Sequence, residues 1–364
     1  MSSFLKAHQS QWECHRENVH NVSDILQSKM KNDLITVFIP VYNGEKFLRS
    51  SWDSLRVQTF SRFRVLYVDD SSTDNSWDIL QALAVEDSRI QVYRKKNQGS
   101  VPFSWNYVFP KIETEFTLYM SQDDLLENDC LEKLVQRQEE TQADAVVCTV
   151  EFFHERQKSQ TRVDSGLNGD CSRIISGREA YQLSLDYTIP GFCLWNTKII
   201  RDVGVLTDAF NSDEYAQRIW FLNSPRVAFS DARFYYRQDN PLAITKTFSF
   251  NKYSSILTNI HLYDSMISED IPRDFHQRMK VEYFGGVLYL SAVYTLLHRQ
   301  YTAKQRGEIE EILQRGYCKF MKLKFAYAKN YMTWLASCNA YMHRIIVYGF
   351  AWKLRMRAFT NKID

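Results

Sequence analysis

In the stretch Phe116-Thr-Leu-Tyr-Met-Ser-Gln-Asp-Asp124, an apolar run stops at two adjacent carboxylates. Aromatic and β-branched residues bounded by polar ones predict a strand, and the segments on either side have helical periodicity. A chain that alternates strands with helices builds a parallel sheet, and ligands of such sheets bind beyond the carboxyl ends of the strands. We therefore expect Asp123 and Asp124 to face a ligand.

The preceding residues predict three further strands, at 34–41, 63–68 and 89–94. The first of these is nearly continuous apolar sequence, as expected for a strand covered on both faces. Apolar positions at helical spacing predict helices over 45–58, from Ser72 or Thr73 through Leu83, and around Trp105. Ser72 or Thr73 is expected to cap the second helix through its side-chain oxygen.

Three of the four strands end in residues that suit a ligand site. Tyr42 follows the first strand, Asp69 and Asp70 the second, and Asp123 and Asp124 the fourth. Four carboxylates in one crevice repel one another unless a hard divalent cation lies among them, and Mg²⁺ and Mn²⁺ favour oxygen sites shared with substrate phosphates. The pattern predicts a metal-held diphosphate. The alternative is that the acidic pairs only cap helices and that Tyr42 only packs.

Two other kinds of nucleotide site lack their motifs. No G-x-G-x-x-G follows the first strand, where Gly44 is the only glycine, so the backbone there cannot cradle a pyrophosphate as in dinucleotide-binding folds. No Walker A sequence occurs in the chain.

Five segments together resemble glycosyltransferase family 2, in the same order and spacing. They are Thr36-Val-Phe-Ile-Pro-Val-Tyr-Asn-Gly-Glu-Lys-Phe-Leu48, Ser54-Leu-Arg-Val-Gln-Thr-Phe60, Val68-Asp-Asp-Ser-Ser-Thr-Asp74, Asn97-Gln-Gly99 and Gln122-Asp-Asp124. The resemblance is strong over residues 34–153 and looser over 154–245. It implies an α/β chain with the GT-A fold, a mixed and mostly parallel sheet flanked by helices. It also implies a nucleotide-sugar donor, a divalent metal (Mn²⁺ or Mg²⁺) and inversion at the anomeric carbon.

The resemblance also implies roles for the residues at the ends of the first two strands. Pro40 and Tyr42 would line the pocket of the nucleotide base, with Glu45 near it. Asp70 would accept a hydrogen bond from the base, usually uracil.

In the acidic motif, the resemblance places Asp123 near the ribose or the metal and Asp124 on the metal. Two positions depart from the family pattern. Ser121 stands where the family often has a first Asp, and Trp105 stands where a basic residue is common.

An inverting transfer needs a carboxylate that takes the proton of the acceptor hydroxyl. The segment 210–218 resembles the family's acidic motif at the start of a helix. We expect Asp213 to be this base, with Glu214 as the second choice. The alternative for this segment is helix capping by Ser212 together with a favourable helix dipole for the two acids.

Three later residues are further candidates by resemblance or by chemistry. Arg237 and Lys246 lie in a segment that resembles the family's closing loop and are candidate phosphate contacts. Trp195 either lines the acceptor pocket or packs in the core.

The formal net charge of the 364 residues is only +2, but its distribution is uneven. Residues 312–363 contain ten Lys or Arg and no Asp or Glu. Residues 331–359 mix these cations with aromatic side chains, which predicts an interfacial helix on an anionic membrane leaflet. The alternative is a basic helix pair packed on the catalytic domain. Nucleic acid suits this segment less well, because it is strongly apolar between its charges.

We expect three regions: a helical arm over 1–33, a GT-A domain over 34–248 and a helical region over 249–364. Residues 1–33 lack the apolar core of a signal peptide, and no stretch reaches the ~20 apolar residues of a membrane span. Seven scattered cysteines without a C-x-x-C pair favour a reducing compartment. These features predict a cytoplasmic location, with peripheral attachment to the inner face of the cell membrane.

The predicted function is transfer of a sugar, from a UDP-sugar as the favoured donor, to a hydroxyl of a saccharide acceptor. The acceptor would be a lipid-linked repeat unit of a bacterial surface polysaccharide such as an O-antigen or a capsule. The alternative is a GT-A protein without catalytic activity, which binds a nucleotide or acts as a scaffold at the membrane.

Overall fold

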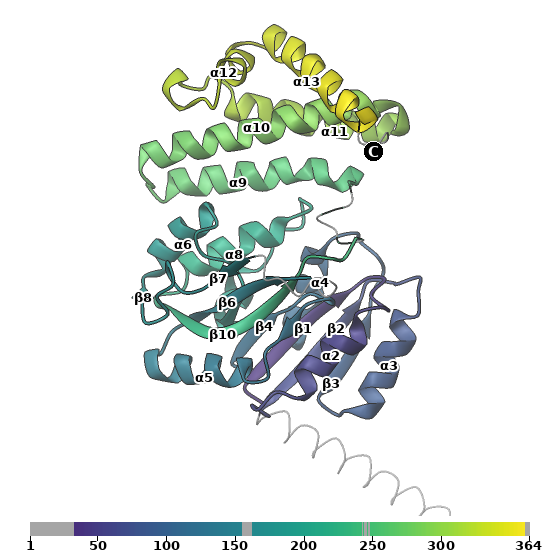
Figure 1. Cartoon of the computed structure of the whole chain (residues 1–364), viewed down its shortest axis with the longest axis vertical. Helices are drawn as coiled ribbons and strands as arrows, with labels where there is room; N and C mark the ends of the chain where they lie inside the picture. The colour runs from purple at the N-terminus through teal and green to yellow at the C-terminus, as the bar shows by residue number, and fades with distance from the viewer. Residues whose placement is uncertain (1–32, 155–161, 242, 244–245, 247, 361–364) are drawn as a thin grey trace, which may run out of the picture.

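The computed structural model describes residues 33–154, 162–241, 243, 246 and 248–360. The predicted arm over 1–33 therefore lies, except for Asp33, outside the described residues. Within them the chain forms a mixed sheet covered by helices on both faces, with further helical layers on one side (Figure 1).

The described residues form one sheet of ten strands, whose central order is β3-β2-β1-β4-β9-β6-β10-β5. The strands are β1 (Ile35–Val41), β2 (Phe63–Asp69), β3 (Ile90–Arg94), β4 (Phe116–Tyr119), β5 (Leu125–Leu126), β6 (Ala145–Phe153), β7 (Arg162–Asp164), β8 (Ile174–Ile175), β9 (Cys193–Asn196) and β10 (Val227–Arg237). The longest pairings, β1 with β2 and β6 with β10, are parallel, whereas β9 runs antiparallel between β4 and β6. The sheet is thus mixed and mostly parallel, which confirms the predicted fold class.

The parallel pairing of β1 with β2 and β4 brings their carboxyl ends to one edge of the sheet. Val41 pairs with Asp69 across β1 and β2, and Phe38 pairs with Tyr119 across β1 and β4. β1 is buried along its length except at Pro40, which is half-buried. The residues that follow these three strands therefore share one crevice edge, as the sequence predicts.

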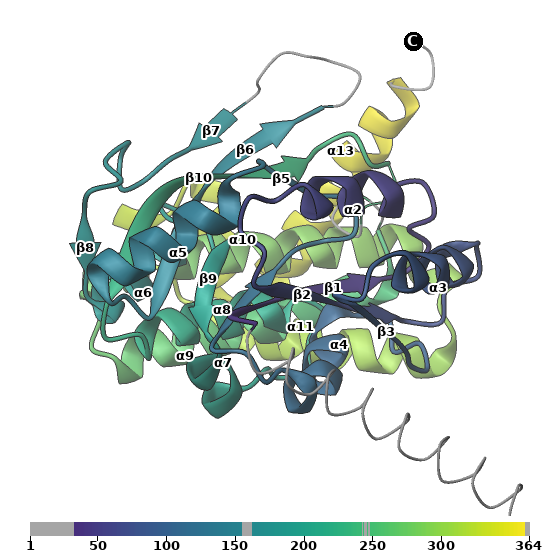
Figure 2. The same cartoon turned by 90° about the horizontal axis from the view of Figure 1, so that it is seen from below.

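Helices cover both faces of this sheet (Figures 1 and 2). One face carries α2 (Leu48–Arg56), α3 (Ser76–Glu86) and α5 (Cys130–Thr141), and the other carries α4 (Val101–Val108), α6 (Gly177–Leu185), α7 (Thr197–Val203) and α8 (Ser212–Leu222). A short 3₁₀ turn, η1 (Phe109–Lys111), follows α4.

Two predicted helix starts are wrong. α2 begins at Leu48 and not at Glu45, and α3 begins at Ser76, after Asn75. Ser72 does not cap α3, because its hydroxyl accepts a hydrogen bond from the backbone NH of Asn43 in the loop after β1. A tertiary contact thus takes the oxygen that a local cap would use.

The chain beyond the sheet is helical. It contains η2 (Phe250–Ser254), α9 (Ser255–Ser268), α10 (Arg273–Leu297), η3 (His298–Gln300), α11 (Ala303–Phe320), η4 (Phe325–Tyr327), α12 (Tyr331–Cys338) and α13 (Ala340–Thr360). Side chains of α8, α9, α10 and α11 share one hydrophobic core with the sheet. None of the described helices is long and apolar enough to cross a membrane.

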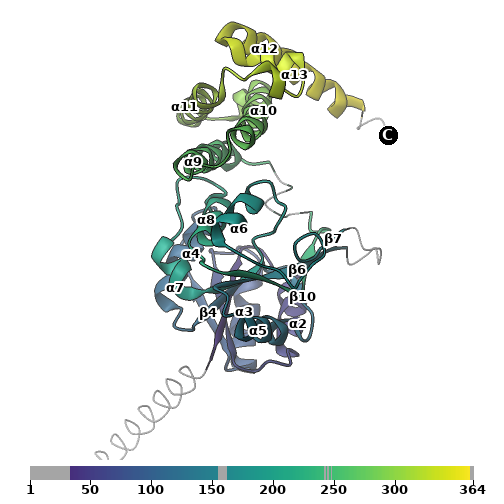
Figure 3. The same ribbon diagram turned by 90° about the vertical axis from the view of Figure 1, so that its left-hand side faces the viewer.

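The last two helices, of which only α13 carries Lys or Arg, do not pack on the sheet. α13 packs against α10 and α12, and Figures 1 and 3 show both outer helices at the end of the molecule that is farthest from the sheet. The predicted alternative, a basic helix pair on the catalytic domain, is therefore wrong for the residues that the structure describes.

Candidate active site

The loops that follow β1 and β2 interlock through side-chain to backbone hydrogen bonds. The Gly44 NH donates to Ser76 Oγ over 2.8 Å, and the Glu45 NH donates to Asp74 Oδ2 over 3.1 Å. The Glu45 carboxylate in turn accepts from the Asn75 NH and side-chain amide, each over 3.1 Å. Glu45, a predicted neighbour of the base pocket, thus joins the two loops that would enclose a base.

Tyr42 leaves β1 with its ring half exposed, at 49% of the reference surface. Gln122 fixes its backbone: the Tyr42 NH donates to Gln122 Oε1 over 2.9 Å, and Gln122 Nε2 donates to the Tyr42 carbonyl over 3.1 Å. A Cβ on Gly44 would lie 2.4 Å from Gln122 Oε1, so this contact requires glycine at 44. Gln122 stands in the segment Gln122-Asp-Asp124 that resembles the family, yet the sequence predicts no role for its side chain.

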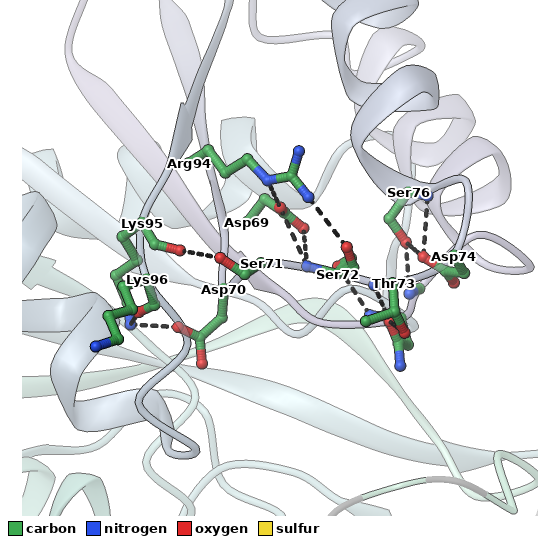
Figure 4. Close-up of polar contacts among 12 residues, drawn as sticks. Asp69, Asp70, Ser71, Ser72, Thr73, Asp74, Ser76, Arg94, Lys95 and Lys96 are labelled. Carbon is green, nitrogen blue, oxygen red and sulfur yellow. Dashed lines mark hydrogen bonds and ion pairs between the residues drawn. The ribbon is translucent and has the colours of Figure 1, made fainter.

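The two acids after β2 have different surroundings, as Figure 4 shows. Asp69 is buried, accepts from the Ser72 NH over 3.2 Å and pairs with Arg94 Nε over 3.0 Å. Asp70 pairs with the Lys95 ammonium and accepts from the Gln98 NH over 3.3 Å. Lys95 was missed by the sequence analysis.

The acidic pair after β4 is held from β10. Asp124 is buried, its Oδ1 accepts from the Arg237 NH over 3.0 Å, and its Oδ2 accepts from the Ser121 NH over 3.3 Å. Asp123 Oδ2 accepts from Asn240 Nδ2 over 2.7 Å. Burial, and next the charge of Asp123, raise the pKa of Asp124 well above its ordinary value. A nearby cation would relieve both effects.

The four carboxylates predicted for one crevice do not gather around one point. Asp69 and Asp70 face Arg94 and Lys95, and the described residues contain no group of three or more His, Cys, Asp or Glu that could hold a metal. The pair Asp123 and Asp124 still fits a hard divalent cation, because two carboxylates supply oxygen ligands and substrate phosphates complete such sites.

Arg237 lies differently from the predicted phosphate contact. Its guanidinium is buried over the rings of Phe47 and Phe153, with ring-centroid distances of 5.1 and 4.8 Å, and its Nε donates to the Asp123 carbonyl over 2.8 Å. It thereby positions the acidic pair. The Lys246 ammonium, the other predicted phosphate contact, donates to the Gln238 carbonyl.

Asp213 lies in the first turn of α8. Burial, and next the charge of Glu214, raise the pKa of Asp213 to about 7. The pKa of the Tyr119 hydroxyl is raised by burial and then by the charges of Asp213 and Asp124, so both acids lie near the same tyrosine. The fold thus brings Asp124 and Asp213, far apart in sequence, within electrostatic reach of Tyr119.

Glu214 and Ser212, the two alternatives to Asp213 in this segment, have other partners. Glu214 pairs with Arg218 over 2.6 Å, so this carboxylate is neutralised by a buried cation. Ser212 is the first residue of α8, and its hydroxyl donates to the Ala209 carbonyl over 3.1 Å without capping the helix.

The chain is similar in sequence and in structure to known glycosyltransferases. Residues 36–203 match the model of glycosyl transferase family 2. These residues therefore form a glycosyltransferase family 2 domain. The glycosyltransferase GlyG of Streptococcus pneumoniae serotype 4 is 25% identical over 215 residues, which are 57% of this chain and 71% of GlyG.

A further relative and a solved structure are also similar to this glycosyltransferase. The uncharacterized glycosyltransferase EpsJ of Bacillus subtilis is 24% identical over 58% of this chain, and the match spans only 63% of EpsJ. The crystal structure of S. aureus TarS 1–349 in complex with UDP-GlcNAc matches with a TM-score of 0.58 and 16% identity, over 87% of this chain and 89% of that chain. TarS and this glycosyltransferase therefore share a fold.

Two tryptophans of the glycosyltransferase belong to its core. Trp105 is fully buried, with its ring centroid 4.6 Å from Phe38 and 5.1 Å from Trp220. Trp195 is equally buried, 4.7 Å from Phe221. Trp105, at the position where the sequence suggested a missing basic residue, therefore packs in the core. Trp195 was expected either to line the acceptor pocket or to pack in the core, and it packs in the core.

Proposed function

We propose that this glycosyltransferase transfers a sugar from a UDP-sugar to a hydroxyl of a saccharide acceptor, with inversion at the anomeric carbon. The observation that carries the proposal is that Asp124 and Asp213 both lie near Tyr119. Asp124 has a second carboxylate, Asp123, beside it, and Asp213 has a pKa of about 7. One acid suits a metal and diphosphate, and the other suits proton removal from an acceptor.

The donor half rests on the edge of β1 and β2. The half-exposed ring of Tyr42 can stack on a base. Asp70, whose carboxylate binds the Lys95 ammonium and the Gln98 NH, is the proposed acceptor for a base NH. Pro40 and Glu45 complete the proposed pocket. TarS, which has the same fold, was crystallised with UDP and with UDP-GlcNAc, and this favours uracil as the base.

Asp124, with Asp123 beside it, is the proposed ligand pair for Mn²⁺ or Mg²⁺. A divalent cation held there supplies Lewis-acid neutralisation of the diphosphate charge. Arg237 holds the Asp124 carboxylate through its backbone NH and the Asp123 backbone carbonyl through its guanidinium.

Asp213 is the proposed general base. In an inverting transfer its carboxylate takes the proton of the acceptor hydroxyl, the hydroxyl oxygen forms a bond to the anomeric carbon, and the bond from that carbon to the diphosphate breaks. UDP leaves with the electron pair of that bond. A pKa of about 7 suits a group that must accept a proton at neutral pH.

For the acceptor we propose a lipid-linked repeat unit of a surface polysaccharide. Such an acceptor places the enzyme in the cytoplasm, attached to the inner face of the cell membrane through residues 331–359. We further propose that residues 34–248 form the GT-A catalytic domain and that residues 249–364 form the helical region.

The experiment that tests the proposal is release of UDP from a panel of UDP-sugars, with extracted lipid-linked saccharides as acceptors and Mn²⁺ present. We expect turnover with one donor, and we expect Asp213→Asn to abolish it while UDP still binds. Near-normal turnover in Asp213→Asn would show that another group is the base. A folded protein that binds UDP but forms no UDP from any of the UDP-sugars would instead support the scaffold alternative.

A further inference from the structure

The outermost helix, α13, has one face against the protein and one face toward solvent. Val347 and Ala351 are buried in the shared core, and Ile346, Phe350 and Leu354 pack against it. The opposite face has no neighbouring element in the described part of the chain, at the end of the molecule shown in yellow in Figures 1 and 3.

That solvent face carries a row of large apolar side chains. Tyr341, Ile345, Tyr348 and Trp352 are exposed by 72%, 46%, 65% and 67%. Their spacing of four, three and four residues places them on one side of the helix. A continuous exposed apolar row marks a surface that binds a partner, whereas scattered exposed residues need no explanation.

The neighbouring helix α12 also exposes large apolar side chains. Tyr331 and Met332 are exposed in its first turn, and Trp334 contacts the rings of Tyr331 and Phe325 at 5.6 and 5.4 Å. Tyrosine and tryptophan combine an apolar body with a polar atom, so they are enriched where protein meets the headgroup region of a bilayer.

Cations flank the row, and acids are absent from this part of the sequence. Arg344 and Arg355 follow Tyr341 and Trp352 by three residues and lie along one flank, and Lys353 lies on the other; all three are exposed. Residues 312–363 contain no Asp or Glu. An apolar stripe bordered only by positive charge complements an anionic lipid surface.

We propose that α13 lies flat in the interface of an anionic bilayer, with the row Tyr341, Ile345, Tyr348 and Trp352 inserted between headgroups and Arg344, Lys353 and Arg355 on lipid phosphates. The inference rests on the proposed function in one respect, the lipid-linked acceptor. The membrane face and the Asp124 and Asp213 site lie on separate layers of the molecule, because α9–α11 pack between them (Figure 3). Variants of one therefore leave the other intact.

The first test is co-sedimentation of the full chain with vesicles of phosphatidylglycerol or of phosphatidylcholine. We expect binding to phosphatidylglycerol only. The double variant Tyr348→Ser, Trp352→Ser should bind at least about tenfold more weakly, because it removes the inserted side chains. Val85→Ser is the matched control, since Val85 is 89% exposed on the sheet domain and should not affect binding.

The second test concerns charge and leaves the apolar row unchanged. Lys353→Glu with Arg355→Glu should weaken binding to phosphatidylglycerol vesicles at least about tenfold. Added salt should also weaken the binding of the native protein to these vesicles. Lys198→Glu with Lys304→Glu is the matched double reversal at exposed lysines elsewhere, whose side chains are 81% and 88% exposed, and should bind normally.

Three results would overturn the inference. These are a native chain that stays in the supernatant with phosphatidylglycerol vesicles, equal binding to both lipids, and a dimer in light scattering that Trp352→Ser converts to monomer. The last result would make this face an interface between two copies. Calorimetric binding of UDP with Mn²⁺, without vesicles, separates the outcomes: if UDP binds while vesicles do not, only this inference fails and the proposed function stands.

Discussion

At the scale of single residues, the site contains acids with different surroundings. Asp124 is held by backbone NH groups of Ser121 and Arg237, whereas Asp213 is crowded by Glu214. The pKa of Asp213, raised to about 7 chiefly by burial, makes a base that is about half ionised at neutral pH and mostly protonated below it. We therefore expect the rate of transfer to fall as the pH falls through about 7, which a pH profile of UDP release would measure.

The control for this profile is Asp213→Asn, which should lower turnover by roughly 10²- to 10⁴-fold above pH 7, where the native base is ionised, and should remove the fall in rate below pH 7. A profile of the native enzyme that is flat between pH 5 and 8 would contradict the assignment.

The same pKa predicts a pH dependence of stability. The folded pKa of Asp213, about 7, lies above its ordinary value of 3.8, so the unfolded chain loses this proton first as the pH rises. The folded state binds more protons between these two values, and the contribution of Asp213 to the free energy of unfolding falls as the pH rises through that window. Asp213→Asn should therefore be more stable than the native protein at pH 8 in urea unfolding. Equal or lower stability of the variant at pH 8 would contradict this.

Gln122 provides a further prediction for nucleotide binding. Its two hydrogen bonds to the Tyr42 backbone are worth about 1 kcal/mol each, and they fix the ring proposed to stack on the base. Gln122→Ala should weaken UDP binding by about tenfold, measured by calorimetry. Unchanged UDP affinity in a folded variant would show that Tyr42 needs no such support.

The sequence predicts many of the site residues but not the contacts that hold them in place. Tyr42, Asp70 and Asp124 follow from the ends of apolar runs. Gln122 binds a residue 80 positions away and Arg237 binds one 113 positions away, and only the folded chain brings such partners together. Asp69 looks like Asp70 in sequence, yet it pairs with Arg94.

At the scale of elements, period and composition predict the first four strands and the helices between them. The position of β9, antiparallel between β4 and β6, does not follow from local pattern, because register and strand order are set by tertiary packing. The start of α3 shows the same limit, since Ser72 binds the Asn43 NH.

Two glycines of α11 give a matched test of how this helix packs. A Cβ on Gly316 would lie 2.5 Å from Ile256 Cγ2 and 2.8 Å from Val287 Cγ2, whereas a Cβ on Gly307 would meet no atom within 4 Å. Gly316→Ala should lower the free energy of unfolding by about 1–3 kcal/mol. Gly307→Ala should raise it by up to about 1 kcal/mol. Urea unfolding measures both, and equal effects would mean that α11 does not pack on α9 and α10 as described.

At the scale of the whole molecule, the sheet and the helical layers share a hydrophobic core. This core contains Trp220 of α8, Ile256 of α9 and Phe284 of α10. Polar contacts also join the two parts: the Tyr181 hydroxyl lies 2.6 Å from Ser265 Oγ, and the Phe210 NH donates to Ser254 Oγ over 2.8 Å. A shared core favours one cooperative unit.

We therefore expect a single calorimetric unfolding transition for the full chain, with equal calorimetric and van't Hoff enthalpies. Two separated transitions would show that the helical region is an independent domain.

The central claim is that the edge formed by β1, β2 and β4 binds UDP together with a metal on Asp124. The most direct test is calorimetric titration of UDP, with GDP as the control nucleotide, with and without Mn²⁺, on the native protein, on Asp124→Ala and on the exposed control Asp78→Ala. The account predicts Mn²⁺-dependent binding of UDP that is lost in Asp124→Ala and kept in Asp78→Ala. UDP binding that is indifferent to Mn²⁺ and to Asp124→Ala, or no binding of UDP with Mn²⁺ present, would contradict it.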